Sequence, residues 1–294
     1  MDKPLQGKVA VVAGGTRGAG RGIAVELGAF GGVVYVTGRS TRTAGSPMRR
    51  PETIEETAEL VAAAGGQGIP VRVDHTVPEE VEALFRRVEA EQGRLDVLVN
   101  DVWGGDPLTS WDVPFWRHDL AQGLEMQRLG VTTHLITSHY AAPLMVEARS
   151  GLIVEITDGV DSDYRGSLFY DLVKSSVIRL AYAQAEELRP HGVAAVAVTP
   201  GFLRSEAMLE GFGVTEANWQ EGARIDPNFI ASETPHFVGR AVAHLAADPD
   251  IMTRSGQVIA SWDAAEHYGL TDVDGRRPHW GNHFRDVVLA KAAG

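Results

Sequence analysis

Tyr170 and Lys174 have the residue types and spacing that suit proton transfer. They lie four positions apart in a segment that opens a predicted helix, so both side chains lie on one helical face. A lysine ammonium beside a phenol stabilises the phenolate and lowers the pKa of the tyrosine toward neutral pH. The pair therefore predicts a proton donor to a carbonyl group that is being reduced.

A glycine-rich segment after the first predicted strand has the composition of a nucleotide-phosphate site. Its spacing is Gly-x3-Gly-x-Gly, and a helical stretch follows it. Glycines at this place let backbone amides approach a pyrophosphate, whose charge the N-terminus of the helix favours. A purely structural turn is the alternative, but the position within a βαβ unit favours a nucleotide. The predicted cofactor-binding residues here are Gly14, Thr16, Arg17, Gly18, Ala19 and Gly20.

The cofactor preference is predicted from the end of the second strand, at Gly38-Arg39. A site for NAD usually carries an acidic residue there, to bind the ribose hydroxyls. In this chain Arg17 and Arg39 can both reach the adenosine ribose, and Arg42 can assist them. Arginine suits a 2′-phosphate, so the sequence favours NADPH over NADH. The alternative is that these arginines are only solvated surface residues.

The elements that must position these residues alternate between short β-branched runs and helix-length segments. The predicted strands are Val9–Ala13, Val33–Thr37, Ile69–Val73, Leu95–Asn100, Leu152–Thr157, Val193–Thr199 and Val258–Ser261. Predicted helices include Thr53–Ala64, Glu79–Gln92 and Ser175–Leu188. Nearly continuous apolar strands that alternate with helices predict an α/β fold, a doubly wound parallel sheet covered on both faces. We expect residues 1–294 to form one domain.

Two segments exceed what the crossovers between strands need, and a third lies beyond the last strand. Residues 40–52 form a basic loop that contains proline and glycine. Residues 202–234 lie beyond the sixth strand, at the sheet edge where ligands of open α/β folds bind, and are predicted to form a substrate lid. A packed surface excursion is the alternative for this segment. Residues 262–294 are predicted to form a C-terminal extension.

Composition and charge narrow the classes of protein to which the chain can belong. The formal charge is −12, which argues against nucleic acid or anionic membrane surfaces as partners. The chain has no cysteine, so thiolate nucleophiles, disulfides and zinc-thiolate sites are excluded. No apolar run approaches the ~18 residues that cross a bilayer, and the N-terminus lacks an apolar signal core. We therefore expect a cytoplasmic protein that acts on a small molecule.

These motifs together resemble the short-chain dehydrogenase/reductase family along the whole chain. The resemblance rests on the glycine turn, Asp74, Val99-Asn100, Tyr170 with Lys174, Pro200-Gly201 and Ser205. The tail, from Ser255 to Val258 and from Tyr268 to Arg276, resembles the branch that contains dehydrogenase/reductase SDR family member 1. The family implies a Rossmann-like fold, hydride transfer with a nicotinamide cofactor, and a homodimer or homotetramer.

The resemblance also implies a role for individual residues. Asp74 would bind adenine, and Asn100 would line the cofactor site. Tyr170 would donate the proton, and Lys174 would hold the nicotinamide ribose. Pro200, Gly201, Phe202 and Leu203 would border the nicotinamide, with Phe202 also facing the substrate.

The chain departs from the family at several catalytic positions. Asp158 stands where the family usually has a serine, although Thr157 or Ser162 could replace that serine after a register shift. The usual asparagine of the long middle helix is replaced by Gln127 or Arg128. Asp101 replaces a second asparagine after the fourth strand, and Trp103 replaces a small residue, where it is predicted to wall the substrate pocket.

An aspartate at position 158 changes the expected chemistry. An ionised carboxylate would repel an alkoxide by ~4 kcal/mol at 4 Å for an effective dielectric constant of 20. Asp158 would therefore have to be protonated to assist a C=O substrate, or the substrate would be a cationic C=N group that a carboxylate stabilises. Pteridine reductases of the same family are similar in having Asp at this position. We predict a reductase for C=O or C=N compounds; the alternative is an NADP(H)-binding sensor or assembly partner without redox turnover.

Two further groups of residues have less specific patterns. Trp111, Phe115 and Trp116 precede the middle helix, and we expect them in the core or in a subunit interface. His279 and His283 have helical spacing, but a glycine interrupts it and there is no evident third ligand. We therefore expect no metal site.

Overall fold

The structure is a computed structural model that describes residues 3–46, 48–161 and 163–290. Its strands are β1 (Val9–Ala13), β2 (Val33–Gly38), β3 (Gln67–Arg72), β4 (Val97–Asn100), β5 (Gly151–Ile156), β6 (Val193–Thr199) and β7 (Val258–Ala260). Its α-helices are α1 (Gly18–Ala29), α2 (Ile54–Ala63), α3 (Pro78–Gln92), α4 (Leu120–Gln127), α5 (Thr133–Ala148), α6 (Leu168–Leu188), α7 (Glu206–Gly211), α8 (Pro235–Ala247), α9 (Ser261–Tyr268) and α10 (Trp280–His283). A π-helical turn, Arg128–Thr132, joins α4 to α5.

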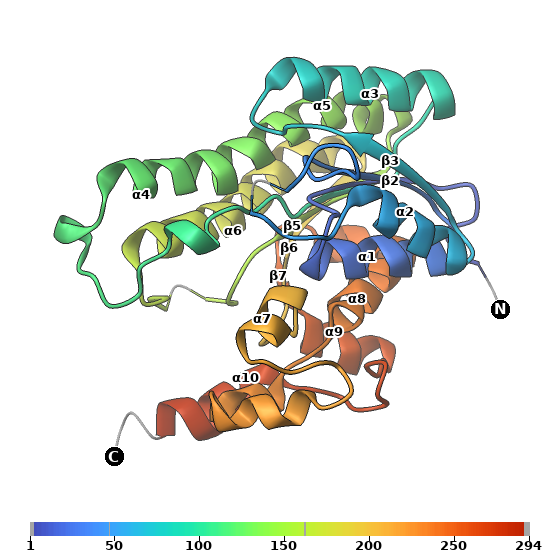
Figure 1. Cartoon of the computed structure of the whole chain (residues 1–294). Helices are drawn as coiled ribbons and strands as arrows, with labels where there is room; N and C mark the ends of the chain where they lie inside the picture. The colour runs from blue at the N-terminus through green and yellow to red at the C-terminus, as the bar shows by residue number, and fades with distance from the viewer. Residues whose placement is uncertain (1–2, 47, 162, 291–294) are drawn as a thin grey trace.

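All seven strands pair in parallel in the order β3-β2-β1-β4-β5-β6-β7, which confirms the predicted doubly wound sheet (Figure 1). The central strands β1, β4 and β6 are buried along their whole length, as strands covered on both faces must be. The strand order reverses between β1 and β4. Open α/β sheets bind ligands at such a reversal, beyond the carboxyl ends of the strands.

Two apolar cores lie on opposite faces of the sheet, and neighbouring residues of one strand alternate between them. In β2, Val34 and Val36 belong to the core beneath α1, α2 and α8, whereas Tyr35 belongs to the core beneath α3, α5 and α6. This alternation follows from the two-residue period of a strand. The cores fix both helical layers, and with them the loops at the ends of the strands.

The predicted and observed elements differ mainly at their ends. β3 begins and ends earlier than predicted, and its Pro70 is tolerated because β3 is an edge strand. The predicted helix Ser175–Leu188 and the helical turn at Tyr170 belong to one helix, α6, which begins at Leu168. Tyr170 therefore lies in the first turn of a 21-residue helix that packs on the sheet.

The segment 202–234 forms α7 and two short 3₁₀-helices, Trp219–Arg224 and Pro227–Ala231. Its anchor is Arg204, a fully buried arginine whose Nη1 donates to the Ser232 carbonyl at 3.1 Å. Arg204 Nη2 also lies 3.5 Å from the Asp274 carboxylate, and its guanidinium lies 4.1 Å from the Trp219 ring centroid. These contacts tie the segment to the C-terminal tail. Among the described residues, no helix has the length and apolar character needed to span a bilayer.

Candidate active site

A cavity of about 730 Å³ opens beyond the carboxyl ends of the strands. It is lined by residues that are far apart in the sequence, which the parallel topology brings to one edge of the sheet. Of the predicted site residues, it gathers Gly14, Thr16, Arg17, Gly18, Ala19, Arg39, Asp74, Trp103, Asp158, Tyr170, Lys174, Pro200, Gly201, Phe202 and Leu203. Among the residues that the structure describes, the predicted residues Gly20, Asn100 and Arg42 lie outside this lining.

The glycine turn has a backbone that only glycine adopts without strain. Gly14 has φ +88° and Gly18 has φ +57°. A Cβ on Gly14 would lie 2.3 Å from the Asp101 carbonyl oxygen, so this glycine lets β1 approach the end of β4. Gly20 lies behind the turn, where a Cβ would lie 2.5 Å from the Gly14 carbonyl oxygen. The turn thus directs the N-terminus of α1 into the cavity, an arrangement that suits an anion.

Substituting Gly14 by Ala tests whether this close approach holds the turn together. We expect Gly14→Ala to lower the free energy of unfolding by at least about 2 kcal/mol, because it combines backbone strain with a backbone clash. Gly45→Ala is the matched control, since no described atom lies within 4 Å of its Cβ position. Urea unfolding measures both variants, and an equal stability of the two would contradict this interpretation.

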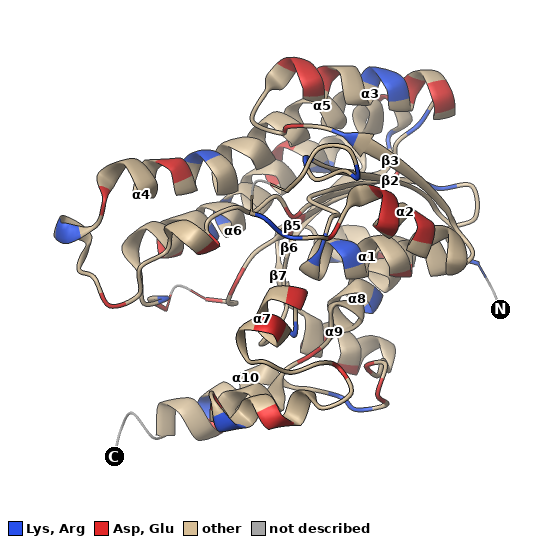
Figure 2. Ribbon diagram, in the orientation of Figure 1, with Lys and Arg blue, Asp and Glu red and all other residues tan. Residues whose placement is uncertain are grey.

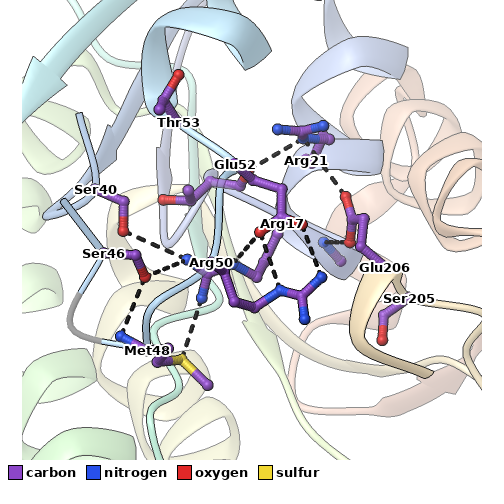
Figure 3. A network of polar contacts seen from close by, with 12 residues as sticks. Arg17, Arg21, Ser40, Ser46, Met48, Arg50, Glu52, Thr53, Ser205 and Glu206 are labelled. Carbon is purple, nitrogen blue, oxygen red and sulfur yellow. Dashed lines mark hydrogen bonds and ion pairs between the residues drawn. The ribbon is translucent and has the colours of Figure 1, made fainter. Parts of the chain in front are cut away.

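Basic residues surround the end of the cavity next to β2 (Figure 3). Arg17 Nη2 donates to Ser46 Oγ at 3.0 Å, and Arg17 Nε lies 3.3 Å from Glu52 Oε2 in an ion pair. Arg39 lies 3.7 Å from the Asp74 carboxylate and is partly exposed. Arg50 also lines the cavity, although sequence reasoning placed it only within a basic loop. Arg42 instead lies outside the lining, on the exposed surface, where it pairs with Glu59.

Asn100 lies behind the cavity wall. Its Nδ2 donates to Ser138 Oγ and to Glu155 Oε1, both at 2.9 Å. Glu155 is fully buried and also lies 2.7 Å from His134 Nδ1. The other ring nitrogen of His134 lies 3.1 Å from the Val102 carbonyl oxygen. Asn100 therefore belongs to a buried polar network that supports the wall of the cavity.

Asp101 connects the end of β4 to the glycine turn. A Cβ on Gly20 would lie 2.8 Å from Asp101 Oδ2, so the carboxyl group packs directly against the turn. Burial raises the pKa of Asp101 to about 7. A family asparagine is thus replaced by an acid that is only partly ionised near neutral pH.

Tyr170, Asp158 and Lys174 meet at the floor of the cavity. The Tyr170 hydroxyl donates a hydrogen bond to Asp158 Oδ2 at 2.9 Å. Lys174 Nζ lies 5.4 Å from the Tyr170 ring centroid and 4.5 Å from the Trp103 ring centroid. Burial lowers the pKa of Lys174. The geometry places a phenol between a carboxylate and an ammonium.

The expected lowering of the Tyr170 pKa is wrong. Burial, and next the negative charge of Asp158, raise the pKa of Tyr170 well above its usual value. The positive charge of Arg165 opposes these effects on the pKa of Tyr170 but does not offset them. Tyr170 therefore holds its proton across the neutral pH range.

The contacts of Thr157 bear on which residue takes the place of the serine that the family usually has. Thr157 is buried, and its hydroxyl donates to the Lys174 carbonyl at 2.8 Å. Its proton is therefore already used in a hydrogen bond to the backbone of α6. Ser162 lies outside the described residues. Asp158 is thus the side chain that meets the Tyr170 hydroxyl.

Gln127 and Arg128 have different surroundings. Gln127 Nε2 donates to the Phe169 carbonyl at 2.9 Å, directly before Tyr170 in the chain. Arg128 is exposed and pairs with Glu125 at 2.7 Å. Gln127 is therefore the residue of this pair that faces the first turn of α6.

Aromatic side chains line the part of the cavity around Tyr170. The ring centroids of Trp103 and Trp111 lie 5.6 and 5.0 Å from that of Tyr170, both with edge-on geometry. Trp280 comes from the C-terminal tail and packs 5.6 Å from Phe202. Sequence reasoning missed Trp280 because no local spacing connects it to the site.

Trp111, Phe115 and Trp116 are expected in the core or in a subunit interface; the structure contradicts the core, and the interface stays a prediction. Their exposed fractions are 54%, 54% and 71%. They lie in the segment between β4 and α4, where Phe115 and Trp116 belong to a short 3₁₀-helix, Phe115–Arg117. Trp111 alone of the three reaches the cavity, where it lies edge-on to Tyr170.

The family model described as short chain dehydrogenase matches residues 8–212. The chain belongs to the short-chain dehydrogenase/reductase family, and it is an NAD(P)-dependent oxidoreductase that acts on small molecules. A crystal structure of a short chain dehydrogenase from Mycobacterium thermoresistibile shares the fold with a TM-score of 0.78 and 22% identity, over 94% of this chain and 92% of that one. This likeness confirms the Rossmann-like fold.

Two curated relatives match most of the chain. Dehydrogenase/reductase SDR family member 1 of Mus musculus is 37% identical over 281 residues, which cover 94% of this chain and 86% of the relative. The human protein of that name is 37% identical over 280 residues, with the same coverage. The resemblance to this branch, predicted from the tail, is confirmed.

Proposed function

We propose that the protein is an NADPH-dependent reductase of a small-molecule C=O or C=N group, with Tyr170 as the proton donor. The observation that carries this proposal is the Tyr170 hydroxyl, bonded to Asp158, in the cavity that also holds the glycine turn and Arg17. NADPH consumption by the purified protein in the presence of such substrates tests it. Family membership and the Tyr170–Lys174 pair favour this enzyme over a binding protein without turnover.

The residues of the cavity fit a phosphorylated dinucleotide. The bound cofactor supplies the hydride. The N-terminus of α1, at Gly18 and Ala19, would hold the pyrophosphate, and Arg17 and Arg39 the 2′-phosphate. The positive φ of Gly14 and Gly18, and the position of Arg17 and Arg39 in the lining of the same cavity, support this assignment. By family position, Asp74 would hold adenine, Lys174 the nicotinamide ribose, and Pro200, Gly201 and Leu203 the nicotinamide.

The proton step follows from the state of Tyr170. Its hydroxyl transfers a proton to the reduced oxygen or nitrogen of the substrate, and a phenolate remains that must be reprotonated. Because the pKa of Tyr170 is raised, the protonated donor is present throughout the neutral range. The phenolate needed as a base for oxidation is disfavoured, so we expect oxidation to require a higher pH than reduction.

The lining of the cavity favours a C=N substrate, which becomes cationic when Tyr170 protonates its nitrogen, over a neutral ketone. Asp158 lies at the reacting hydroxyl, and a second carboxylate, Asp106, lines the exposed rim and accepts from Trp103 Nε1 at 2.6 Å. Carboxylates and indole faces both stabilise a cation, here the iminium that forms when Tyr170 gives its proton to the nitrogen of a neutral imine and the hydride then adds to the carbon. A ketone would instead require a protonated Asp158 as a hydrogen-bond donor.

The NADPH preference is tested by removing one cavity arginine and one surface arginine. We expect Arg39→Ala to raise the Kd of NADPH at least about tenfold and to leave that of NADH nearly unchanged, because only NADPH carries the 2′-phosphate. Arg42→Ala is the control, since Arg42 pairs with Glu59 outside the cavity. Calorimetric titration of the wild type and both variants with NADPH and with NADH gives the Kd values to compare. Equal losses for both cofactors in Arg39→Ala would reject the assignment.

A homodimer or homotetramer is also part of the proposal. Exposed apolar side chains occur on α4, α5 and α6, at Leu124, Leu135, Leu172 and Tyr182. A second copy of the chain would cover such a surface. Acidic residues are interspersed with basic ones along the helices (Figure 2), a pattern that does not favour a nucleic-acid partner. Light scattering of the purified protein measures the oligomeric state.

A further inference from the structure

Helix α7 lies in the segment 202–234, which the sequence predicts to be a substrate lid. It carries a carboxylate that is hydrogen-bonded to the glycine turn (Figure 3). Glu206 Oε2 accepts a hydrogen bond from the backbone N–H of Gly18 at 2.8 Å. Gly18 is the first residue of α1, so the carboxylate lies at the positive end of a 12-residue helix. An anion is thus already present at the place where the proposed function puts the cofactor's pyrophosphate.

The ion pair with Arg21 is not the contact that fixes the position of the Glu206 carboxylate. Arg21 Nε lies 3.6 Å from Glu206 Oε1, but the same guanidinium donates to the Thr16 carbonyl at 3.0 Å and to Glu56 at 2.7 Å. The ion pair between Arg21 and Glu206 is therefore the longest of these contacts. The hydrogen bond from Gly18 is the short contact that fixes the carboxylate of Glu206.

The rest of α7 closes over the same part of the cavity. Glu210, one helical turn after Glu206, pairs with Arg50 of the basic loop at 2.6 Å. At the base of the lid, Ser205 Cβ and Leu203 Cδ2 lie 3.8 and 4.0 Å from the Cβ position of Gly18. Both Ser205 and Leu203 line the cavity. The lid thus contacts the phosphate end of the site through a carboxylate, an ion pair and direct packing.

We infer that Glu206 is an affinity-determining residue that competes with the dinucleotide pyrophosphate for the Gly18 amide. This inference rests on the proposed function. One N–H cannot donate fully to two anions, and two anions at one helix terminus repel each other. Cofactor binding therefore displaces the Glu206 carboxylate and loosens α7, so that loading of the cofactor and opening of the lid are coupled.

The test compares Glu206→Gln with the wild type in calorimetric titrations of three probes. NADPH and ADP-ribose both contain the pyrophosphate, whereas 2′-AMP contains adenine and the 2′-phosphate only. We expect Glu206→Gln to tighten NADPH and ADP-ribose about tenfold, the effect of one charge-assisted hydrogen bond, and to leave 2′-AMP unchanged. Glu221→Gln is the matched control, since Glu221 is an exposed acid of the same segment that pairs with Arg224.

A second measurement uses the wild type alone and does not depend on the folding of a variant. Hydrogen exchange of the α7 amides should become faster on addition of ADP-ribose, because the ligand removes the Gly18 contact. Slower exchange, or an unchanged Kd in a folded Glu206→Gln, would overturn the inference and leave the proposed function intact. Failure of the wild type and all variants to bind NADPH would instead overturn the proposed function itself.

Discussion

Replacing Tyr170 by Phe is expected to lower kcat for reduction by about 10²–10⁴, the range for loss of a general acid. The substitution removes only the hydroxyl that donates to Asp158, and it keeps the ring between Trp103 and Trp111. The Kd of NADPH should therefore change little. Steady-state kinetics and calorimetric titration of the same preparation separate the two quantities.

Tyr164→Phe is the control for this prediction. Tyr164 lies in the same loop-to-helix connection, but it is 67% exposed and does not line the cavity. Its removal should leave both kcat and cofactor binding unchanged. Retained turnover in Tyr170→Phe would show that another group protonates the product, and the role given to Tyr170 would be lost.

Replacing Asp158 by Ser is expected to invert the substrate preference. Without the carboxylate, a cationic imine loses its stabilising charge, and a ketone gains a neutral hydroxyl donor in place of a repelling anion. We expect kcat/KM to fall for the imine and to rise for the ketone, by about 10²–10³ in each case. Kinetics on a matched imine and ketone measure both changes. Asp163→Ser, in the same loop but exposed, is the control.

The same substitution should alter the pH dependence of oxidation. In that direction Tyr170 must lose its proton, and burial together with the Asp158 charge raises its pKa. Removing the charge lowers the pKa, so the rise of the oxidation rate with pH should move to lower pH in Asp158→Ser. A rate profile with NADP⁺ and the reduced product measures this shift. An unmoved profile would mean that Asp158 does not control the protonation of Tyr170.

The fold was predictable because its signals are local and repeated. Continuous apolar runs marked β1 and β6 to the residue, since buried parallel strands need no polar positions. Edge strand β3 was misplaced by two residues because its pattern is only half-buried and contains Pro70. The helical turn that opens at Tyr170 and the helix Ser175–Leu188 were predicted separately, whereas they form the single helix α6, which begins two residues earlier at Leu168.

Site residues that belong to a recognisable local motif could be predicted from the sequence. Residues that reach the site from a distant part of the chain could not. The glycine turn, Tyr170 and Lys174 follow from spacing and topology. Trp280 reaches Phe202 from nearly eighty positions away along the chain, so no sequence window contains both. The raised pKa of Tyr170 also escaped sequence reasoning, because it depends on burial and on the side chain that meets the hydroxyl.

The most direct test of the account is NADPH oxidation by the purified wild-type protein with matched ketones, cyclic imines and dihydropterins. We predict turnover that depends on NADPH and is faster with the C=N compounds, because Asp158 lies at the proton donor. Turnover confined to ketones would contradict the charge role of Asp158 and require its protonated form. NADPH binding without turnover on any member of this panel would contradict the proposed reductase.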